Sequence, residues 1–460
     1  MPEHCRARRW SDVLNSERDI GEKDGGRQSA TAGVNTDATR PRTAASIALT
    51  SSELTANALT ANALTSPDDD RADQNPPSVG AGAGNSTVSS HNGRSQPHRS
   101  GGDRRNAGGE PTTVYGALDL GTNNCRLLLA RPSRRGFRVV DAFSRIIRLG
   151  EGVSQSGRLS DHAMSRTLDA LKVCAGKLDR HQVRRTRMVA TQACRVAENG
   201  AEFIATVRDR FGLDIEVLTP ETEARLAVSG CATLIDPSAD YVLVFDIGGG
   251  SSEIIWLDLT RTNSRRNSQG RVDVDEAIMA WTSLPVGVVT LSERFDGRMV
   301  TPDSFAAMSA VVEEMLQPFE DAHRFRDRLA GRKTHILGTS GTVTTIAGIM
   351  LNLPRYDRNK VDGLWLDVPD VNDISRQLLA KSYEQRIAEP CIGRERADLV
   401  LAGCAILDAI LRMWPAERLR VADRGLREGI LTRLMIEDGV WRSARRRRGS
   451  GRRDELGGRR

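Results

Sequence analysis

From about residue 113 onward, short apolar runs alternate with longer stretches in which apolar residues recur at helical spacing. The short runs predict strands, and the helical spacing predicts amphipathic helices. Strands are predicted at 114–118, 126–130, 187–190, 215–218, 241–245, 254–257, 335–337 and 420–422. Helices are predicted at 160–178, with Ser160 or Asp161 as the N-cap, and at 201–211, 221–229, 304–319, 342–351, 374–379, 396–414 and 426–436. The alternation indicates an α/β protein built from two similar segments.

The ends of the chain have a different composition. Residues 1–112 are rich in small and polar residues and predict a disordered, low-complexity extension. We expect one domain at 113–236 and a second at 237–440, whose closing helix is compatible with packing on the first. The polar stretch 260–276 predicts a surface loop.

Charge is concentrated at the C-terminus. The formal net charge is +6, and much of the excess lies in 442–460, with an arginine run at 445–448. Residues 441–460 therefore predict a basic disordered tail. Such a tail either keeps the chain soluble or binds polyanions such as polyphosphate or nucleic acid.

The seven cysteines are scattered, without a CxxC pair or a Cys/His cluster. They predict reduced thiols in a cytosolic protein, mostly small core residues. No apolar run approaches the roughly 20 residues that span a bilayer, and the N-terminus lacks the order of a signal peptide. We therefore expect a cytoplasmic protein without a membrane partner.

Two glycine-rich turns follow strand-like runs. The first contains Asp119, Gly121, Thr122, Asn123 and Arg126, and the second contains Asp246, Gly248, Gly249, Gly250, Ser251 and Glu253. Glycine lets the backbone approach an anion so that successive N–H groups bind phosphate oxygens. An adjacent Asp can hold a divalent cation that neutralises the phosphate. Two such turns predict two similar domains that close on one phosphorylated ligand; a plain tight hairpin is the alternative.

A third candidate is Gly338, Ser340, Gly341 and Thr342, which follow a predicted strand and open a predicted helix. A glycine turn at a helix N-terminus binds anions through free N–H groups and the helix dipole. An ordinary strand-to-helix turn is the alternative.

Two glutamates have positions suited to catalysis. Glu253 follows the three glycines and is expected near a metal or a water, or else is a solvated hairpin residue. Glu223 lies near a helix start at the seam between the halves, where a carboxylate can deprotonate a water. Its alternative role is to favour the helix dipole.

Other polar residues leave two interpretations open. Thr191 and Arg195 follow a strand end and either bind phosphate or cap a helix. The segment 423–429 precedes the last helix, and we expect it to tie the two halves together.

These parts are what phosphoanhydride hydrolysis requires: positioning, a metal, charge neutralisation and an oriented water. An ATPase or sugar kinase of similar build is one alternative, although no sugar-binding cluster is visible. A noncatalytic phosphate or nucleotide sensor is another, but a sensor needs no water-activating base.

The motifs together resemble the exopolyphosphatase/guanosine pentaphosphate phosphohydrolase (Ppx/GppA) family of the actin-like ATPase superfamily. They are YGALDLGTNNCRLLL, ATQACRVAENG, ETEARLAVSG, VFDIGGGSSEI, LPVGVVTLSERF, GTSGTVTTIAG and VADRGLREGIL. The resemblance covers about 113–440. It implies two ribonuclease-H-like domains around a cleft and Mg²⁺-dependent release of terminal phosphate from polyphosphate or guanosine pentaphosphate.

By position, Glu223 resembles the family's water-activating glutamate, and Asp246 and Glu253 resemble its metal-associated carboxylates, with Asp119 near the metal. The turn before Glu223 departs from the family pattern, and no counterpart exists for the long N-terminus. The chain ends soon after the closing helix, so the larger members' C-terminal helical domains are not expected. A homodimer is compatible with the resemblance, but processivity on long chains and dimer-mediated channels are not predicted.

Overall fold

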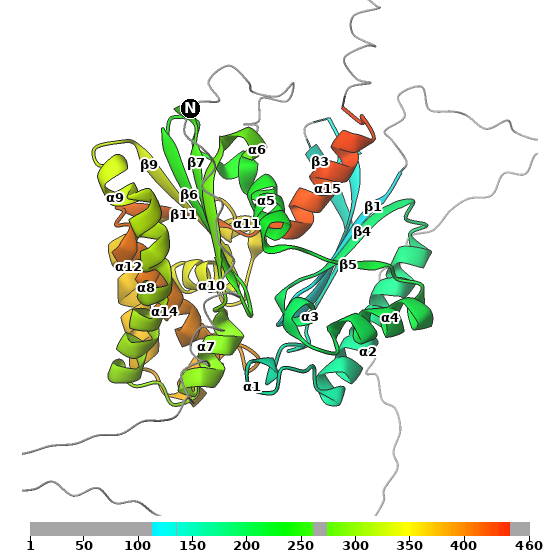
Figure 1. Ribbon diagram of the computed structural model, residues 1–460, viewed down its shortest axis with the longest axis horizontal. Coiled ribbons are helices and arrows are strands. Elements are labelled where there is room, and N and C mark those ends of the chain that lie inside the picture. The colour runs from blue at the N-terminus through cyan, green and yellow to red at the C-terminus, as the bar shows by residue number, and fades with distance from the viewer. Residues whose placement is uncertain (1–112, 135, 261–273, 442–460) are drawn as a thin grey trace, which may run out of the picture. The chain divides into compact units, whose positions relative to one another are not determined.

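The computed structural model describes residues 113–134, 136–260 and 274–441, all of which belong to the same compact unit. They form two sheets, each with its own helices (Figure 1). The predicted extension 1–112, the tail 442–460 and most of the predicted loop 260–276 lie outside the described residues.

The first sheet has the strand order β3-β2-β1-β4-β5. Its strands are β1 (Tyr115–Leu120), β2 (Asn124–Ser133), β3 (Gly136–Ile146), β4 (Arg185–Ala190) and β5 (Ile215–Val217). The first three form an antiparallel meander, and β4 and β5 add in parallel beside β1. The connecting helices are α1 (Val153–Ser156), α2 (Asp161–Arg180), α3 (Gln192–Val196) and α4 (Gly200–Phe211).

The second sheet repeats this plan with the order β10-β11-β9-β6-β7-β8. Its strands are β6 (Tyr241–Ile247), β7 (Ser252–Asp258), β8 (Ile278–Leu284), β9 (Thr334–Ser340), β10 (Trp365–Asp367) and β11 (Arg418–Ala422). Again a meander is extended by parallel strands, here β9 and β11, and β10 adds an antiparallel edge. The α/β class and the duplication predicted from the sequence are therefore confirmed.

Helices of the second half follow its strands. They are α6 (Val274–Ala277), α7 (Val288–Phe295), α8 (Pro302–His323), α9 (Phe325–Arg328), α10 (Gly341–Met350), α11 (Arg358–Val361), α12 (Val368–Ala380), α13 (Tyr383–Ile387), α14 (Val400–Met413) and α15 (Leu426–Glu437). In Figure 1 the helices α8, α12 and α14 lie together on one side of this sheet.

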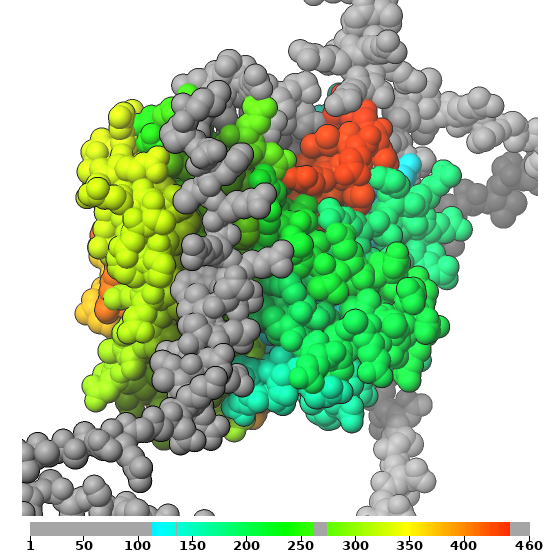
Figure 2. All heavy atoms as spheres, viewed as in Figure 1, coloured from blue at the N-terminus to red at the C-terminus, as the bar shows by residue number. Residues whose placement is uncertain are grey.

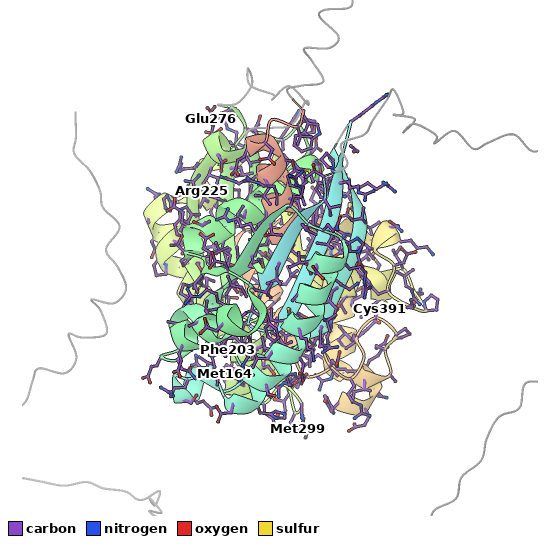
Figure 3. All side chains as sticks on the ribbon, turned by 90° about the vertical axis from the view of Figure 1, so that its right-hand side faces the viewer. Met164, Phe203, Arg225, Glu276, Met299 and Cys391 are labelled. Carbon is purple, nitrogen blue, oxygen red and sulfur yellow. The ribbon has the colours of Figure 1, made fainter. Side chains whose placement is uncertain are left out.

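Each half has an apolar core of its own. In the first, helices α2 and α4 cover the sheet, and Met164 and Phe203 lie near each other on this layer (Figure 3). In the second, Trp256 of β7 stacks on Phe325 with ring centroids 4.8 Å apart. Helix α2 begins where predicted, because the Ser160 side chain accepts a hydrogen bond from the Ala163 N–H at 3.2 Å.

The two halves exchange helices. Helix α5 (Pro220–Cys231), which precedes the second sheet in the chain, packs residues such as Val228 into an apolar cluster with β6 and β7. Helix α15, which follows the second sheet, packs Ile430 and Leu431 against β1 and β2 of the first. Helix α15, red in Figure 2, lies at the surface beside the green elements of the first half. A boundary at 236/237 thus divides the chain into two segments, but each segment contributes a helix to the apolar packing of the other.

Glycines allow α5 and α15 to approach closely. A Cβ on Gly230 would lie 1.9 Å from the Gly425 carbonyl oxygen, and a Cβ on Gly429 would lie 2.0 Å from that of Leu226. At the far end of α15, the Tyr115 hydroxyl donates to Asp438 at 2.8 Å. The contacts of Gly425 and Gly429 agree with the prediction that the segment 423–429 ties the halves together.

Several local predictions were wrong. Strand β9 continues through Ser340, so Gly338 lies inside a strand rather than in a turn. Helix α6 occupies the end of the predicted loop. The strand β8 was not predicted because the polar residues Thr282 and Ser283 interrupt its apolar run.

The six described cysteines are buried, free thiols. Within the described ranges, no helix is both long enough and apolar enough to cross a membrane.

Candidate active site

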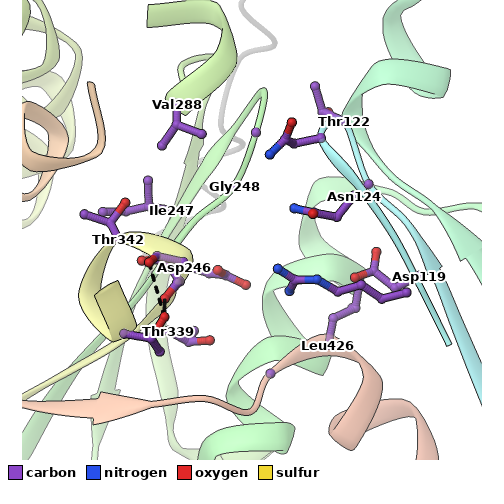
Figure 4. A pocket seen from close by; sticks show the side chains of 18 of the residues that line it. Asp119, Thr122, Asn124, Asp246, Ile247, Gly248, Val288, Thr339, Thr342 and Leu426 are labelled. Atoms are coloured by element: carbon purple, nitrogen blue, oxygen red, sulfur yellow. Dashed lines mark hydrogen bonds between the residues drawn. The ribbon is translucent and has the colours of Figure 1, made fainter. Parts of the chain in front are cut away.

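A polar pocket lies where elements of both halves meet. Most of the predicted site residues line it: Asp119, Gly121, Thr122, Asn123, Arg126, Thr191, Glu223, Asp246, Gly248, Gly249, Gly250, Ser251, Ser340, Gly341 and Thr342. In Figure 4, Asp119, Thr122 and Asn124 face Asp246, Gly248 and Thr342 across this space. Arg195, Glu253 and Gly338 do not line the pocket.

The two glycine-rich turns have the same internal hydrogen bond. The Gly121 N–H donates to the Asn124 carbonyl at 2.9 Å, and the Gly248 N–H donates to the Ser251 carbonyl at 2.9 Å. Each turn joins two antiparallel strands and follows an Asp, either Asp119 or Asp246. The sequence repeat therefore corresponds to one repeated local structure on opposite walls of the pocket.

The second turn packs directly against the first. A Cβ on Gly249 would lie 3.0 Å from the Asn123 nitrogen, and a Cβ on Gly250 would lie 1.9 Å from Gln192 Oε1. Glycine is needed at 249 because the backbone of the first turn lies against it, a reason that the sequence pattern could not reveal. At 250 the nearest atom belongs to the end of the Gln192 side chain of α3. Gly338 has a different constraint, since a Cβ there would lie 2.5 Å from the Phe245 ring.

A cluster of contacts bridges the halves beside the two turns. Arg148 donates to both carboxylate oxygens of Asp398 at 2.8 Å, and the Gly152 N–H donates to Glu293 at 2.8 Å. The backbone N–H of Arg148 donates to the Asn123 carbonyl at 3.1 Å. On the other side, α7 donates from Val288 to the Gly248 carbonyl at 3.0 Å. The bridge therefore connects elements that are bonded to each turn.

Four carboxyl groups lie within electrostatic reach of one another. Asp119 and Asp246 occupy equivalent positions near the ends of β1 and β6, and Glu253 is paired with Asp246 across the β6–β7 ladder. Glu223 projects from the first turns of α5, whose N-cap Thr219 accepts a hydrogen bond from the Thr222 N–H. The sequence predicted all four as a group, although they are far apart in the chain.

Burial is the largest cause that raises the pKa of each carboxyl, and repulsion by a neighbouring carboxylate adds to it. Burial is the main reason why the pKa of Glu223 is raised to about 8, and the negative charge of Glu253 is the next largest cause. Burial is also the main reason why the pKa of Asp246 is raised to about 7, and the negative charges of Glu223 and Asp119 add to the shift. Burial and Asp246 raise the pKa of Glu253 to about 7, and burial also raises that of Asp119. Ionised carboxylates here therefore require a nearby cation.

The donor set has the chemistry of a divalent-cation site. Hard cations prefer carboxylate and amide oxygens, and the buried Oδ1 atoms of Asn123 and Asn124 have no hydrogen-bond partner. Within residues 113–134, 136–260 and 274–441, however, no group of three or more Asp, Glu, His or Cys side chains is close enough together to hold a metal ion. Glu253 is buried beside Asp246 on the neighbouring strand, where the Ser283 hydroxyl donates to it at 2.9 Å.

Arg195 contacts the predicted base. Its Nη1 lies 3.1 Å from Glu223 Oε2 and also donates to the Leu218 carbonyl at 2.8 Å. This ion pair favours ionised Glu223 and fixes the direction of its side chain. The predicted alternatives for Arg195 were phosphate binding or helix capping, and neither anticipated this contact.

Some pocket residues were not predicted. Val288, Tyr356, Arg396 and Arg427 also line the pocket, from elements far apart in the sequence. The segment containing Arg427 had been singled out for a structural role, and Val288 lies in the quoted motif LPVGVVTLSERF without a role of its own. No local sequence signal marks the others, because long-range packing brings them to the site.

The sequence profile of the Ppx/GppA phosphatase family matches residues 129–437, which is more than half of the chain. The chain therefore belongs to the Ppx/GppA phosphatase family. The first glycine-rich turn precedes this range and is joined to it by β2.

Solved structures agree with this assignment. The Aquifex aeolicus member of the Ppx/GppA family is 28% identical, with 71% of this chain and 98% of that chain covered and a TM-score of 0.57. An exopolyphosphatase from Cytophaga hutchinsonii is 27% identical, with 71% and 98% covered and a TM-score of 0.61. The two sheets thus form the actin-like fold of this family, with two ribonuclease-H-like domains.

Proposed function

We propose that this chain is a Mg²⁺-dependent phosphohydrolase that releases terminal phosphate from inorganic polyphosphate, guanosine pentaphosphate or both. One observation carries the proposal. A half-buried glutamate, Glu223, lies at the seam of a pocket that two phosphate-type turns line from opposite sides. The family assignment and the exopolyphosphatase relative support a phosphoanhydride as the bond that is cleaved.

Each group of pocket residues would have a separate role in hydrolysis. Backbone N–H groups of the two turns, with Thr122 and Ser251, would hold the terminal phosphoryl group. Glu223, ionised with the help of Arg195, would take a proton from the attacking water. Asp119 and Asp246 would hold the cation, with Glu253 supporting Asp246 from the neighbouring strand. When bound, Mg²⁺ would neutralise charge on the phosphate oxygens.

A kinase and a noncatalytic sensor would each need a different set of pocket residues from a hydrolase. A kinase of this superfamily would need a site for a second substrate hydroxyl beside a base. A sensor would bind phosphate without needing a glutamate in the pocket that is held by an arginine. The Glu223–Arg195 pair therefore favours hydrolysis over both.

The direct test is phosphate release from the purified chain with Mg²⁺, comparing polyphosphate and guanosine pentaphosphate at equal concentration. We expect release from at least one of them and none from a simple phosphomonoester. Binding of either compound without phosphate release would favour the sensor. Phosphate release from ATP alone would favour the ATPase.

The raised pKa values predict how the protein without metal responds to pH. A raised carboxyl pKa means that the protonated form favours folding. This stabilisation is complete below the ordinary values of 3.8 and 4.5 and is lost as pH rises through about 7 for Asp246 and Glu253 and about 8 for Glu223. The melting temperature should therefore fall between pH 5 and pH 8.

A bound cation should offset this loss. We expect Mg²⁺ to raise the melting temperature more at pH 8 than at pH 6, because the site is ionised only at the higher pH. The matched control is Asp246→Asn, which should reduce both the pH effect and the Mg²⁺ effect. Equal stabilisation at both pH values would contradict the proposed cation site.

A further inference from the structure

The two halves contact each other at both ends of the pocket. Val288 at the start of α7 and Leu426 at the start of α15 line the pocket at opposite ends (Figure 4). In Figure 1, α5 and α15 cross at the upper end, and α1 and α7 meet at the lower end. The upper contact consists of close glycine approaches, whereas the lower contact is polar. There Glu293 of α7 accepts hydrogen bonds from the Gly152 N–H and the Ser154 hydroxyl, each at 2.8 Å.

A charged pair, Arg148 and Asp398, reinforces the lower contact. The two terminal nitrogens of Arg148 donate to the two carboxylate oxygens of Asp398, each at 2.8 Å. The side chains are 27% and 11% exposed, so water screens the pair only in part. Two parallel charged hydrogen bonds fix both the distance and the direction between the groups that they join. The pair therefore holds the halves at a defined separation at this end.

Each member of the pair is fastened to one of the glycine-rich turns. In the first half, the backbone N–H of Arg148 donates to the Asn123 carbonyl of the first turn at 3.1 Å. In the second half, the Ser292 hydroxyl of α7 donates to the Asp398 carbonyl at 2.8 Å. Helix α7 begins with two N–H groups that donate to carbonyls of the second turn. The pair thus links the two turns through hydrogen-bonded backbone on both sides.

The backbone at Arg148 has an unusual conformation. Its φ of 46° lies in the left-handed region, which residues other than glycine, asparagine and aspartate seldom adopt. Such a conformation costs free energy and persists only where surrounding contacts hold it. The hydrogen bonds of Arg148 to Asp398 and to Asn123 are contacts of this kind. The strained backbone therefore favours a functional role for the pair over an incidental surface contact.

We propose that Arg148 and Asp398 are positioning residues for the reaction, because they preset the two glycine-rich turns against each other. Without the pair, the halves would separate at this end about the α5–α15 crossing, and the bound substrate would have to draw the turns together. Apparent affinity falls in proportion to the fraction of molecules that are already in the binding arrangement. This inference rests on the proposed function and adds residues that act on it through the turns.

The first measurement is the rate of phosphate release from inorganic polyphosphate by the full chain with Mg²⁺. Arg148→Asn removes the guanidinium, and asparagine tolerates the left-handed backbone. We expect KM to rise about tenfold, as for loss of a charged hydrogen bond. Saturating substrate should draw the turns together, so kcat should stay within about twofold of the wild-type value. Asp398→Ala should give the same result and serves if Arg148→Asn does not fold.

Two comparisons make the kinetic result specific to the pair. The double variant should show no larger rise in KM than either single variant, because both substitutions remove the same contact. The matched control is Arg324→Asn, since Arg324 also has a left-handed backbone, with φ 52°, and pairs with Asp327 at 2.7 Å inside the second half. This control should keep the wild-type KM.

Hydrogen exchange of the protein without ligand separates a link between the halves from a local role. Asp398→Ala lies in the second half, yet exchange should quicken at 147–153 in the first half, where the Gly152 N–H bonds to Glu293. Arg148→Asn should in turn quicken exchange at 287–293 in the second half. Inorganic polyphosphate with Mg²⁺ should slow exchange again in both variants.

A wild-type KM in both single variants, or additive losses in the double variant, would overturn the inference and leave the proposed function intact. Exchange that quickens only in the half that carries the substitution would do the same. If the wild type released no phosphate from polyphosphate or from guanosine pentaphosphate, the proposed function would fail. The exchange measurements would then still decide whether the pair links the halves.

Discussion

Replacing Glu223 with glutamine should lower the rate of phosphate release by about 10²- to 10⁴-fold, the usual contribution of a general base. Glutamine keeps the shape of the side chain and still accepts a hydrogen bond from Arg195, which lies 3.1 Å away in the wild type. It cannot take a proton from water. The effect should therefore appear in kcat, with KM for the same substrate little changed.

Two comparisons make this result specific. The matched control, Glu221→Gln, changes an exposed residue of the same helix that pairs with Arg225 at 3.1 Å, and it should retain wild-type activity. The wild-type rate should rise with pH, because the base must be ionised and its pKa in the free protein is about 8. A Glu223→Gln variant that releases phosphate as fast as the wild type would remove Glu223 from the mechanism.

Replacing Gly230 with alanine should cause the largest loss of stability, about 3 kcal/mol, at the upper end of the usual cost of overpacking. The new Cβ would lie 1.9 Å from the Gly425 carbonyl oxygen, where only backbone movement can relieve the clash. Because this contact joins α5 to α15, the separation of the two helices should change with it. Urea unfolding, followed by circular dichroism, measures the loss.

The matched control is Gly176→Ala in α2. Nothing lies within 4 Å of a Cβ at that position, and alanine favours a helix over glycine by about 0.5–1 kcal/mol. This variant should therefore be as stable as the wild type or slightly more so. If Gly230→Ala unfolds at the same urea concentration as the wild type, the close crossing of α5 and α15 is wrong.

The sequence predicted what local patterns encode. Apolar runs that end in Asp and glycine located β1, β2, β6 and β7, and a capped helix start located Glu223. The two turns were predicted as a pair because the motif repeats, and three of the four predicted carboxyl groups, Asp119, Glu223 and Asp246, line the same pocket. Even so, the reason for Gly249 was missed, since it depends on the opposite turn.

What the sequence could not predict depends on contacts between distant segments. The Arg195–Glu223 pair joins residues 28 positions apart, and the Arg148–Asp398 bridge joins residues 250 apart. Arg427 was read as structural because its segment resembles a connecting turn. Only the folded arrangement shows that Arg427 also lines the pocket.

The exchange of α5 and α15 has a consequence for biosynthesis. During translation the first sheet emerges early, but the helix that covers its β1 face is made about 200 residues later. Until then, apolar residues such as Ala117 and Leu128 have no cover from α15, so the first half is exposed to aggregation. A ribosome must nearly finish the chain before either half is complete. Supplying residues 426–437 as a separate peptide to a chain cut before them would show whether the order of synthesis matters.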